Sequence, residues 1–420
     1  MVTAGVSGFA LTRPSSRSPP AARERCPRTA RHAGPSPPIP QPLLQLRAQL
    51  TSARRISRAD APFGAQIRGL WKTAHPVVPG SATIGPMTSE ALAGDLLRLR
   101  HDPPCPSTDD PGMAARVERA RRLLQDVPTD LISTDGAREL GIGCRELRVL
   151  GARGELTRLT HGWYALSAPA TREELHALRA VAHLRRVREG SALSHQSAAI
   201  AHGLPVLDAS LDRVWLAVPP PESRRVLKDV VHTDLRVESV RAVAPGTVSA
   251  VLAVPAAHAI VGTGLNGGAR AFLAAGDAAL RLGLVTRGSI EAAVGSARGL
   301  RGVGSVRAAV AHLDGRHESV GETLTRFALR LLGVAAEPQV TISGSDWSYR
   351  VDFVVDGDLV IEFDGAVKYD GAEGRDALVA EKVREDRIRS AGYRVLRVTW
   401  ADVMDPRRLA GLVAAARDMG

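Results

Sequence analysis

A chain of 420 residues exceeds what one hydrophobic core ordinarily serves, so we expect two or three folded domains. The hydrophobic fraction of 44% is that of a globular protein, and the longest apolar run, residues 248–261, is too short to span a bilayer, which excludes a membrane protein. The formal net charge of +11 is typical of proteins that bind nucleic acids.

The positive charge is concentrated in the first 86 residues. They hold 12 of the 55 Lys and Arg residues, only two of the 44 Asp and Glu residues, and 13 of the 27 prolines. We therefore expect residues 1–112 to be a disordered leader rich in Arg and Pro, or to precede the true start of the chain at Met87 or Met113. Because the remainder is nearly neutral, DNA binding by the folded part must depend on local basic patches.

Residues 113–168 have the pattern of a winged helix-turn-helix domain. The predicted elements are helices over 113–126, 134–140 and 145–150 and strands over 155–159 and 163–166. In such a domain the second helix of the motif enters the major groove, so Arg145, Arg148 and Arg153 are the candidates for contact with DNA. The alternative is a solvated basic face on a small helical domain that binds protein or nothing.

The strand after these helices carries a family resemblance. The run His161-Gly162-Trp163-Tyr164 stands where abortive-infection-type antitoxin proteins have a Gly-x-Tyr-like strand. Residues 113–168 thus resemble the N-terminal domain of those antitoxins.

Residues 171–315 are predicted to be a mixed, mostly helical, antitoxin-like region. Its expected elements are helices over 195–202, 269–284 and 289–297 and a strand over 214–218. Gly262, Gly264, Gly267 and Gly268 lack the Lys-Ser/Thr ending of a nucleotide-binding loop and are predicted to be turn glycines.

Residues 319–420 are predicted to form an α/β unit with one sheet flanked by helices. Its expected elements are a helix from about 319, a hairpin of strands over 349–355 and 359–363, a helix over 377–391, a strand over 394–400 and a helix over 406–417.

The hairpin of this unit carries two acidic side chains in mid-strand. If Asp356-Gly357-Asp358 forms a three-residue loop with its glycine left-handed, Asp352 lies opposite Glu362, whereas a two-residue loop would place Ile361 there. Asp364 then emerges on the same face. Clustered oxygen ligands suit Mg²⁺ or Mn²⁺, so these three acids are the predicted metal ligands. The alternative is a polar strand face without function.

Four motifs of the C-terminal unit resemble a known family. They lie, in order, at 350–355, 360–365, 381–387 and 392–400. They resemble the nuclease-like domain family related to very-short-patch-repair endonucleases, within the PD-(D/E)XK superfamily. The resemblance covers about a hundred residues and implies a restriction-endonuclease-like fold.

The resemblance also implies roles for particular residues. It makes Asp352 and Glu362 catalytic as well as metal-binding, and Glu322 the acid of the preceding helix, although Ser319-x-x-Glu322 is equally a helix capping box. Asp364 stands where the superfamily has its lysine.

Basic residues near the motifs are the candidates for the remaining roles. Lys368 or Lys382 is the expected replacement for the missing lysine. Arg384 and Arg387 are candidates for contact with nucleic acid, or else pair with Glu381 and Asp386.

Two functions from different classes follow. The preferred hypothesis is a Mg²⁺- or Mn²⁺-dependent DNA endonuclease, targeted by its winged helix, in phage defence or repair. The alternative is an antitoxin-like transcriptional regulator with an inactive nuclease-like domain, for which the resemblance implies a cognate toxin as partner. A structural protein without a nucleic-acid role is a third, less specific reading. The three widely spaced cysteines form no disulfide framework and favour the cytoplasm.

Overall fold

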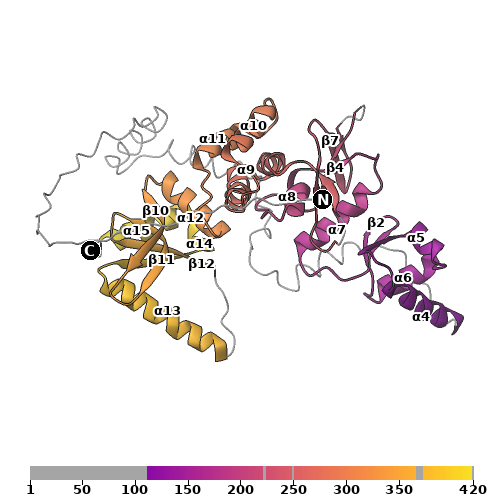
Figure 1. Cartoon of the computed structure of the whole chain (residues 1–420), viewed down its shortest axis with the longest axis horizontal. Coiled ribbons are helices and arrows are strands. Elements are labelled where there is room, and N and C mark those ends of the chain that lie inside the picture. The colour runs from indigo at the N-terminus through magenta and orange to yellow at the C-terminus, as the bar shows by residue number, and fades with distance from the viewer. Residues whose placement is uncertain (1–110, 221–223, 248–249, 366–371, 419–420) are drawn as a thin grey trace, which may run out of the picture. The chain divides into compact units, whose positions relative to one another are not determined.

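The computed structural model describes residues 111–420 apart from 221–223, 248–249, 366–371 and 419–420. The expected leader thus lies almost wholly outside the described residues. In the described part, helices accompany sheets of antiparallel and mixed type (Figure 1), so the predicted α/β class is confirmed. Within these ranges no helix combines the length and the apolar character that a membrane span requires.

The first described segment combines three helices with a small antiparallel sheet. Its elements are α4 (Pro111–Gln125), β1 (Leu131–Ser133), α5 (Thr134–Glu139), α6 (Cys144–Ala152), β2 (Thr157–Thr160) and β3 (Trp163–Ala165). The sheet order is β1-β3-β2. The strand β1 was not predicted because three residues are too few to show alternation. Ser133 caps α5 by accepting a hydrogen bond from the Gly136 N–H at 2.9 Å.

The second segment contains a six-stranded mixed sheet of order β6-β7-β5-β4-β9-β8, together with several helices. Its helices are α7 (Arg172–Leu184), α8 (His195–Ala201), α9 (Ala256–Arg281), α10 (Arg287–Ser296), α11 (Val303–Ala309) and the 3-10 turn η2 (Val310–His312). Its strands are β4 (Ala192–Leu193), β5 (Val214–Val218), β6 (Arg225–Val226), β7 (Val230–Asp234), β8 (Val240–Ala242) and β9 (Val251–Ala253). Only β5 was predicted, since most of the other strands are too short for a sequence period.

Glycines predicted to be in turns lie inside α9 instead. A Cβ atom at Gly262 would come within 2.8 Å of His195, and one at Gly264 within 2.7 Å of Phe272, so both glycines allow close packing. Gly268 has a φ of 78° and interrupts the helix. The turn prediction was wrong for Gly262 and Gly264. Each is a glycine because a neighbour in the tertiary structure packs closely against it, and a local sequence pattern does not reveal such neighbours.

The third segment has a four-stranded sheet of order β10-β11-β12-β13, in which β12 and β13 are parallel. Its elements are α12 (Val320–Leu331), β10 (Ala336–Ser343), β11 (Ser348–Val355), β12 (Leu359–Asp364), α13 (Ala372–Ser390), β13 (Arg394–Thr399), α14 (Trp400–Val403) and α15 (Pro406–Asp418). The strand β10 was not predicted, because Pro338 and the left-handed Gln339, with φ 57°, interrupt its pattern.

The two faces of this sheet pack against different helices. Phe353 and Ile361 belong to a cluster with α12 and α15, whereas Val354 and Val360 pack with Ile388 of α13. Figure 1 shows α13 along one side of these strands. Because side chains alternate along β12, Glu362 lies with Val360 on the face that α13 covers, whereas β11 departs from strict alternation next to Asp352, since Val351 and Val354 belong to one cluster.

Candidate active site

The β11–β12 hairpin has the register that the carboxylate hypothesis requires. Its pairs are Phe353 with Ile361, Val354 with Val360, and Val355 with Leu359, around a three-residue loop. Gly357 in that loop has a φ of 91°. The predicted loop length and left-handed glycine are therefore confirmed. Extending this register by one residue places Asp352 opposite Glu362.

Asp352 is held by the backbone of the neighbouring strand. Its Oδ2 accepts a hydrogen bond from the Phe363 N–H at 2.8 Å. Burial raises the pKa of the Asp352 carboxyl to about 6; the Phe363 N–H opposes this effect, and the negative charges of Glu322 and Glu362 add to it. The three acids therefore interact electrostatically, although they come from α12, β11 and β12.

Glu362 is buried, with 8% of its surface exposed, and it is bound by an arginine of α13. Arg384 Nη2 lies 2.6 Å from Glu362 Oε1, and Nη1 lies 3.0 Å from Oε2. Such a bidentate pair is among the stronger charge-assisted arrangements. The guanidinium thus supplies the positive charge that a buried carboxylate needs.

The side chain of Glu322 forms hydrogen bonds at the start of α12. The Ser319 hydroxyl accepts from the Glu322 N–H at 3.1 Å, as a helix cap requires. Glu322 Oε2 accepts from the Glu318 N–H at 3.0 Å and from Gln339 Nε2 at 2.7 Å. Ser319 therefore caps α12, but the reciprocal half of a capping box is not formed, since Glu322 accepts from the Glu318 N–H and not from the Ser319 N–H. The charge of Glu322 acts on Asp352 as well.

Asp364 lies at the end of β12, half-buried, where it pairs in register with Thr399 of β13. Across the described ranges no group of three carboxylate, imidazole or thiol side chains is arranged to hold a metal ion. The participation of Asp364 as a third ligand stays a prediction.

Of the two predicted replacement lysines, only Lys382 belongs to the described residues. Lys368 lies outside the described residues. Lys382 is exposed, and it precedes Arg384 by two residues, which turns it roughly 200° around the helix from the side that faces Glu362. In the described part of α13 it is Arg384, and not Lys382, that contacts Glu362.

The predicted nucleic-acid contacts on α13 have partners within the protein. Arg384 also bonds Glu381 at 3.3 Å. Arg387 donates to the Tyr349 hydroxyl at 3.0 Å and lies 3.6 Å from Asp346. The ion-pair alternative is thus the better description of Arg384, and its pairing with Glu381 was foreseen, whereas the bond to Glu362 was not.

Two residues of the site were missed in the sequence. Arg397 of β13 pairs in register with Glu362 and bonds Glu381 and Glu385 of α13. Gln339 lies in the unpredicted strand β10. The sequence signal for Arg397 was its positive charge in the middle of a predicted strand. The sequence contained no comparable signal for Gln339.

A glycine makes room for the ring that follows Glu362. A Cβ atom at Gly321 would overlap the ring of Phe363, which also packs edge-on against Trp400 with ring centroids 4.9 Å apart. We expect Gly321→Ala to lower the free energy of unfolding by about 1–3 kcal/mol through overpacking, measured by chemical denaturation. Gly411→Ala on α15, where a Cβ meets nothing within 4 Å, is the control and should stabilise slightly. Equal effects of the two substitutions would contradict this packing.

The three arginines predicted to contact DNA lie at or after α6. Arg145 and Arg148 are exposed on the helix, and the exposed Arg153 follows its last residue. The opposite side of α6 is buried through Leu147, Val149 and Leu150. The basic side chains therefore project from the helix surface that faces away from the core.

The donor set at Asp352 and Glu362 fits a hard divalent cation, because Mg²⁺ is typically bound by one or two carboxylates together with waters and substrate phosphates. Both oxygens of Glu362 engage Arg384, so any cation there shares this carboxylate with the guanidinium. No family model, curated protein or solved structure matches this chain.

Proposed function

We propose that residues 319–420 form a Mg²⁺- or Mn²⁺-dependent DNA endonuclease domain of the restriction-endonuclease-like class. The observation that carries the proposal is the placement of Asp352 and Glu362 side by side on paired strands, where burial, and to a smaller extent the charges of Glu322 and Glu362, raise the pKa of Asp352. Buried like charges of this kind are typical of functional sites. A bound cation would lower the pKa of its water and offset charge on the phosphodiester.

In this proposal, the residues of the protein itself have separate roles. Asp352 and Glu362 hold the cation, and the Phe363 N–H orients Asp352. Arg384 balances the charge of Glu362, and Glu322 fixes the start of α12 through Glu318 and Gln339. Lys368 remains the candidate for the role of the superfamily lysine.

The activity is tested with the purified full chain and supercoiled plasmid DNA. The proposal expects nicked or linear DNA when Mg²⁺ or Mn²⁺ is present and none after EDTA is added. Single-stranded and mismatched substrates belong in the same assay, because the resemblance is to a mismatch-repair nuclease. Lack of cleavage on all substrates with both metals would reject the enzyme proposal.

A DNA-binding regulator with an inactive nuclease-like domain is the second candidate. The bidentate bonds of Arg384 to Glu362 favour it, since an internal cation already compensates this carboxylate. Asp364 in the place of the superfamily lysine favours it too. In this case a cognate toxin protein is a further partner. Retained duplex binding without cleavage is the result that distinguishes this candidate from the first.

We further propose that residues 113–168 form a winged helix that binds DNA. The order helix, strand, helix, helix, strand, strand supports this, together with the exposed arginines of α6.

DNA binding by α6 gives a quantitative prediction. Arg145→Ala with Arg148→Ala should weaken duplex binding and reduce the slope of log K against log salt by about 0.9 for each lost phosphate contact. Fluorescence anisotropy over a salt series measures both quantities. Arg298→Ala with Arg301→Ala removes the same charge from exposed positions after α10 and should change the slope little. If the two double variants lost the same affinity and the same salt dependence, the DNA-binding surface would not lie on α6.

A further inference from the structure

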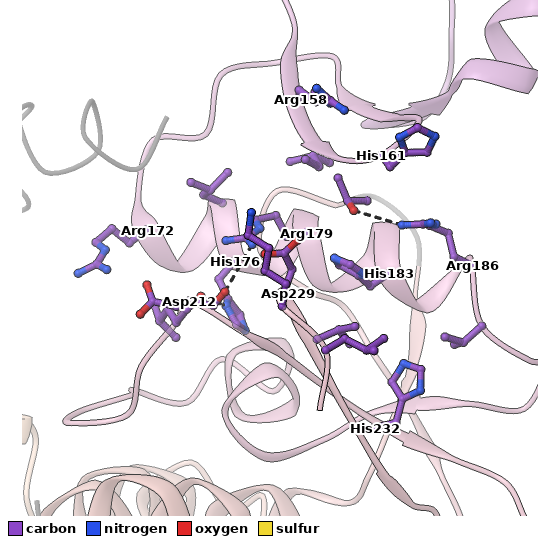
Figure 2. Close-up of a pocket in the computed structure, with 18 residues that line it drawn as sticks. Arg158, His161, Arg172, His176, Arg179, His183, Arg186, Asp212, Asp229 and His232 are labelled. Carbon is purple, nitrogen blue, oxygen red and sulfur yellow. Dashed lines mark hydrogen bonds between the residues drawn. The ribbon is translucent and has the colours of Figure 1, made fainter. Parts of the chain in front are cut away.

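A basic cavity lies between the β2–β3 hairpin, α7 and β7. Its volume is about 850 Å³, within the range of small-molecule sites. In Figure 2, Arg158 and His161 of the hairpin lie on one side of Arg179 and His183 of α7, and His232 of β7 lies on the other. The cavity is therefore built from three separate elements of the chain.

Positive charge dominates this cavity. Its charged lining residues are Arg158, Arg172, Arg179, Arg186 and Lys228 against Asp212 and Asp229. With the histidines neutral, the lining carries a surplus of three positive charges. Asp212 already accepts a hydrogen bond from the Ser210 hydroxyl at 2.8 Å. An anion is the ligand that such a lining attracts.

Basic residues on α7 and directly after it line the cavity. Arg179 and His183, four residues apart, lie on one face of the helix, and Arg186 follows its C-cap. Arg186 also bonds the Thr160 hydroxyl of β2 at 3.2 Å, which links the helix to the hairpin. The guanidinium groups of Arg179 and Arg186 are charge-assisted donors of the kind that binds phosphate oxygens.

His183 has a buried nitrogen that lacks a partner. Only 7% of the residue is exposed, and its Nε2 has no hydrogen-bond partner within the described part of the chain. Burial, and next the charges of Arg179 and Arg186, lower the pKa of His183 to about 4. A buried polar atom without a partner is costly, and a ligand that bonds Nε2 removes that cost.

The adjacent His176 shows what a purely structural histidine looks like here. Its Nδ1 lies 2.9 Å from the Leu211 carbonyl, and its Nε2 lies 2.8 Å from the Ser197 hydroxyl. Both of its ring nitrogens are thus satisfied within the protein, in contrast to Nε2 of His183.

The cavity also has an apolar part. Its aliphatic lining residues are Leu159, Leu175, Val187, Leu211, Leu227 and Val230. Inorganic phosphate gains no binding free energy from such an apolar surface. An organic phosphate gains binding free energy by burying its apolar group there.

We propose that this cavity binds a small organic phosphate of the mononucleotide class, with its phosphate at Arg179, His183 and Arg186 and its apolar group against the aliphatic lining. This site is separate from the carboxylates of the C-terminal domain and does not depend on the nuclease proposal. A nucleotide bound beside the β2–β3 hairpin occupies the part of the chain that we assign to DNA binding.

The test is isothermal titration calorimetry on the full chain with AMP, ATP, inorganic phosphate and a 20-base-pair duplex. We expect AMP or ATP to bind in a 1:1 ratio and more tightly than phosphate. Arg179→Gln with Arg186→Gln should weaken nucleotide binding about tenfold or more, because both charge-assisted bonds are lost. Arg188→Gln with Arg298→Gln removes equal charge from exposed positions outside the cavity and should change binding less than twofold.

A second variant separates ligand binding from folding. His183→Phe removes the unpartnered nitrogen, so it should preserve the melting temperature while weakening nucleotide binding. Three results would overturn the proposal: no binding of AMP or ATP at millimolar concentration, equal weakening by the control pair, or loss of duplex binding rather than nucleotide binding in the Arg179 and Arg186 variant.

Discussion

Asp352→Asn and Glu362→Gln should each reduce metal-dependent DNA cleavage about 100-fold or more, the scale on which loss of one group that stabilises transition-state charge reduces an enzymatic rate. Each substitution removes one negative charge from the pair that we assign to the cation. Single-turnover cleavage with Mg²⁺ in excess measures the effect. Both amides keep the shape of the original side chains, and circular dichroism checks that the variants fold.

The control for these variants lies in the same hairpin. Asp356→Asn makes the same chemical change in the loop, where Asp356 pairs with Arg417. It should cleave at nearly the wild-type rate. A wild-type rate in Asp352→Asn would remove that residue from catalysis, and equal losses in all three variants would indicate a general effect on the fold.

Arg384→Met should destabilise the protein by about 2–4 kcal/mol, because removal of one partner leaves the other charge buried and uncompensated. The side chains of Arg384 and Glu362 are 21% and 11% exposed, so solvent relieves only part of this cost. Combining Arg384→Met with Glu362→Gln removes the stranded charge and should recover most of the stability. Denaturant unfolding of the two single variants and the double variant measures the coupling.

Arg389→Met is the matched control on the same helix. Arg389 pairs with Glu385 at 2.7 Å, but its side chain is 55% exposed. Its loss should cost less than about 1 kcal/mol, as is usual for surface pairs. If Arg384→Met were no more destabilising than Arg389→Met, the buried pair would not stabilise the sheet and helix as described.

Much of the hairpin was predictable from its sequence, because its determinants are local. The loop Asp356-Gly357-Asp358 sets the register, and alternation along β12 puts Glu362 on the face of Val360. The helices α12 and α15 and the strand β13 likewise have apolar patterns of their own. These local signals were sufficient to place Asp352 and Glu362 on adjacent strands.

The partners of those acids were not predictable in the same way. Arg384 reaches Glu362 only because α13 docks on one face of the sheet through Ile388, and 22 residues separate the two side chains in the chain. Lys382, only two residues earlier, was an equally good choice by sequence distance. Gln339 belongs to a strand whose proline and left-handed residue conceal it. Contacts that depend on how a helix docks have no local signal.

The most direct test of the carboxylate site needs no DNA substrate: Mn²⁺ binding to the full chain, followed by electron paramagnetic resonance as Mn²⁺ is added. We predict a bound Mn²⁺ population that Mg²⁺ displaces, that Asp352→Asn abolishes and that Asp356→Asn retains. No bound Mn²⁺ in the wild-type chain, or binding unchanged in Asp352→Asn, would contradict a metal site at Asp352 and Glu362.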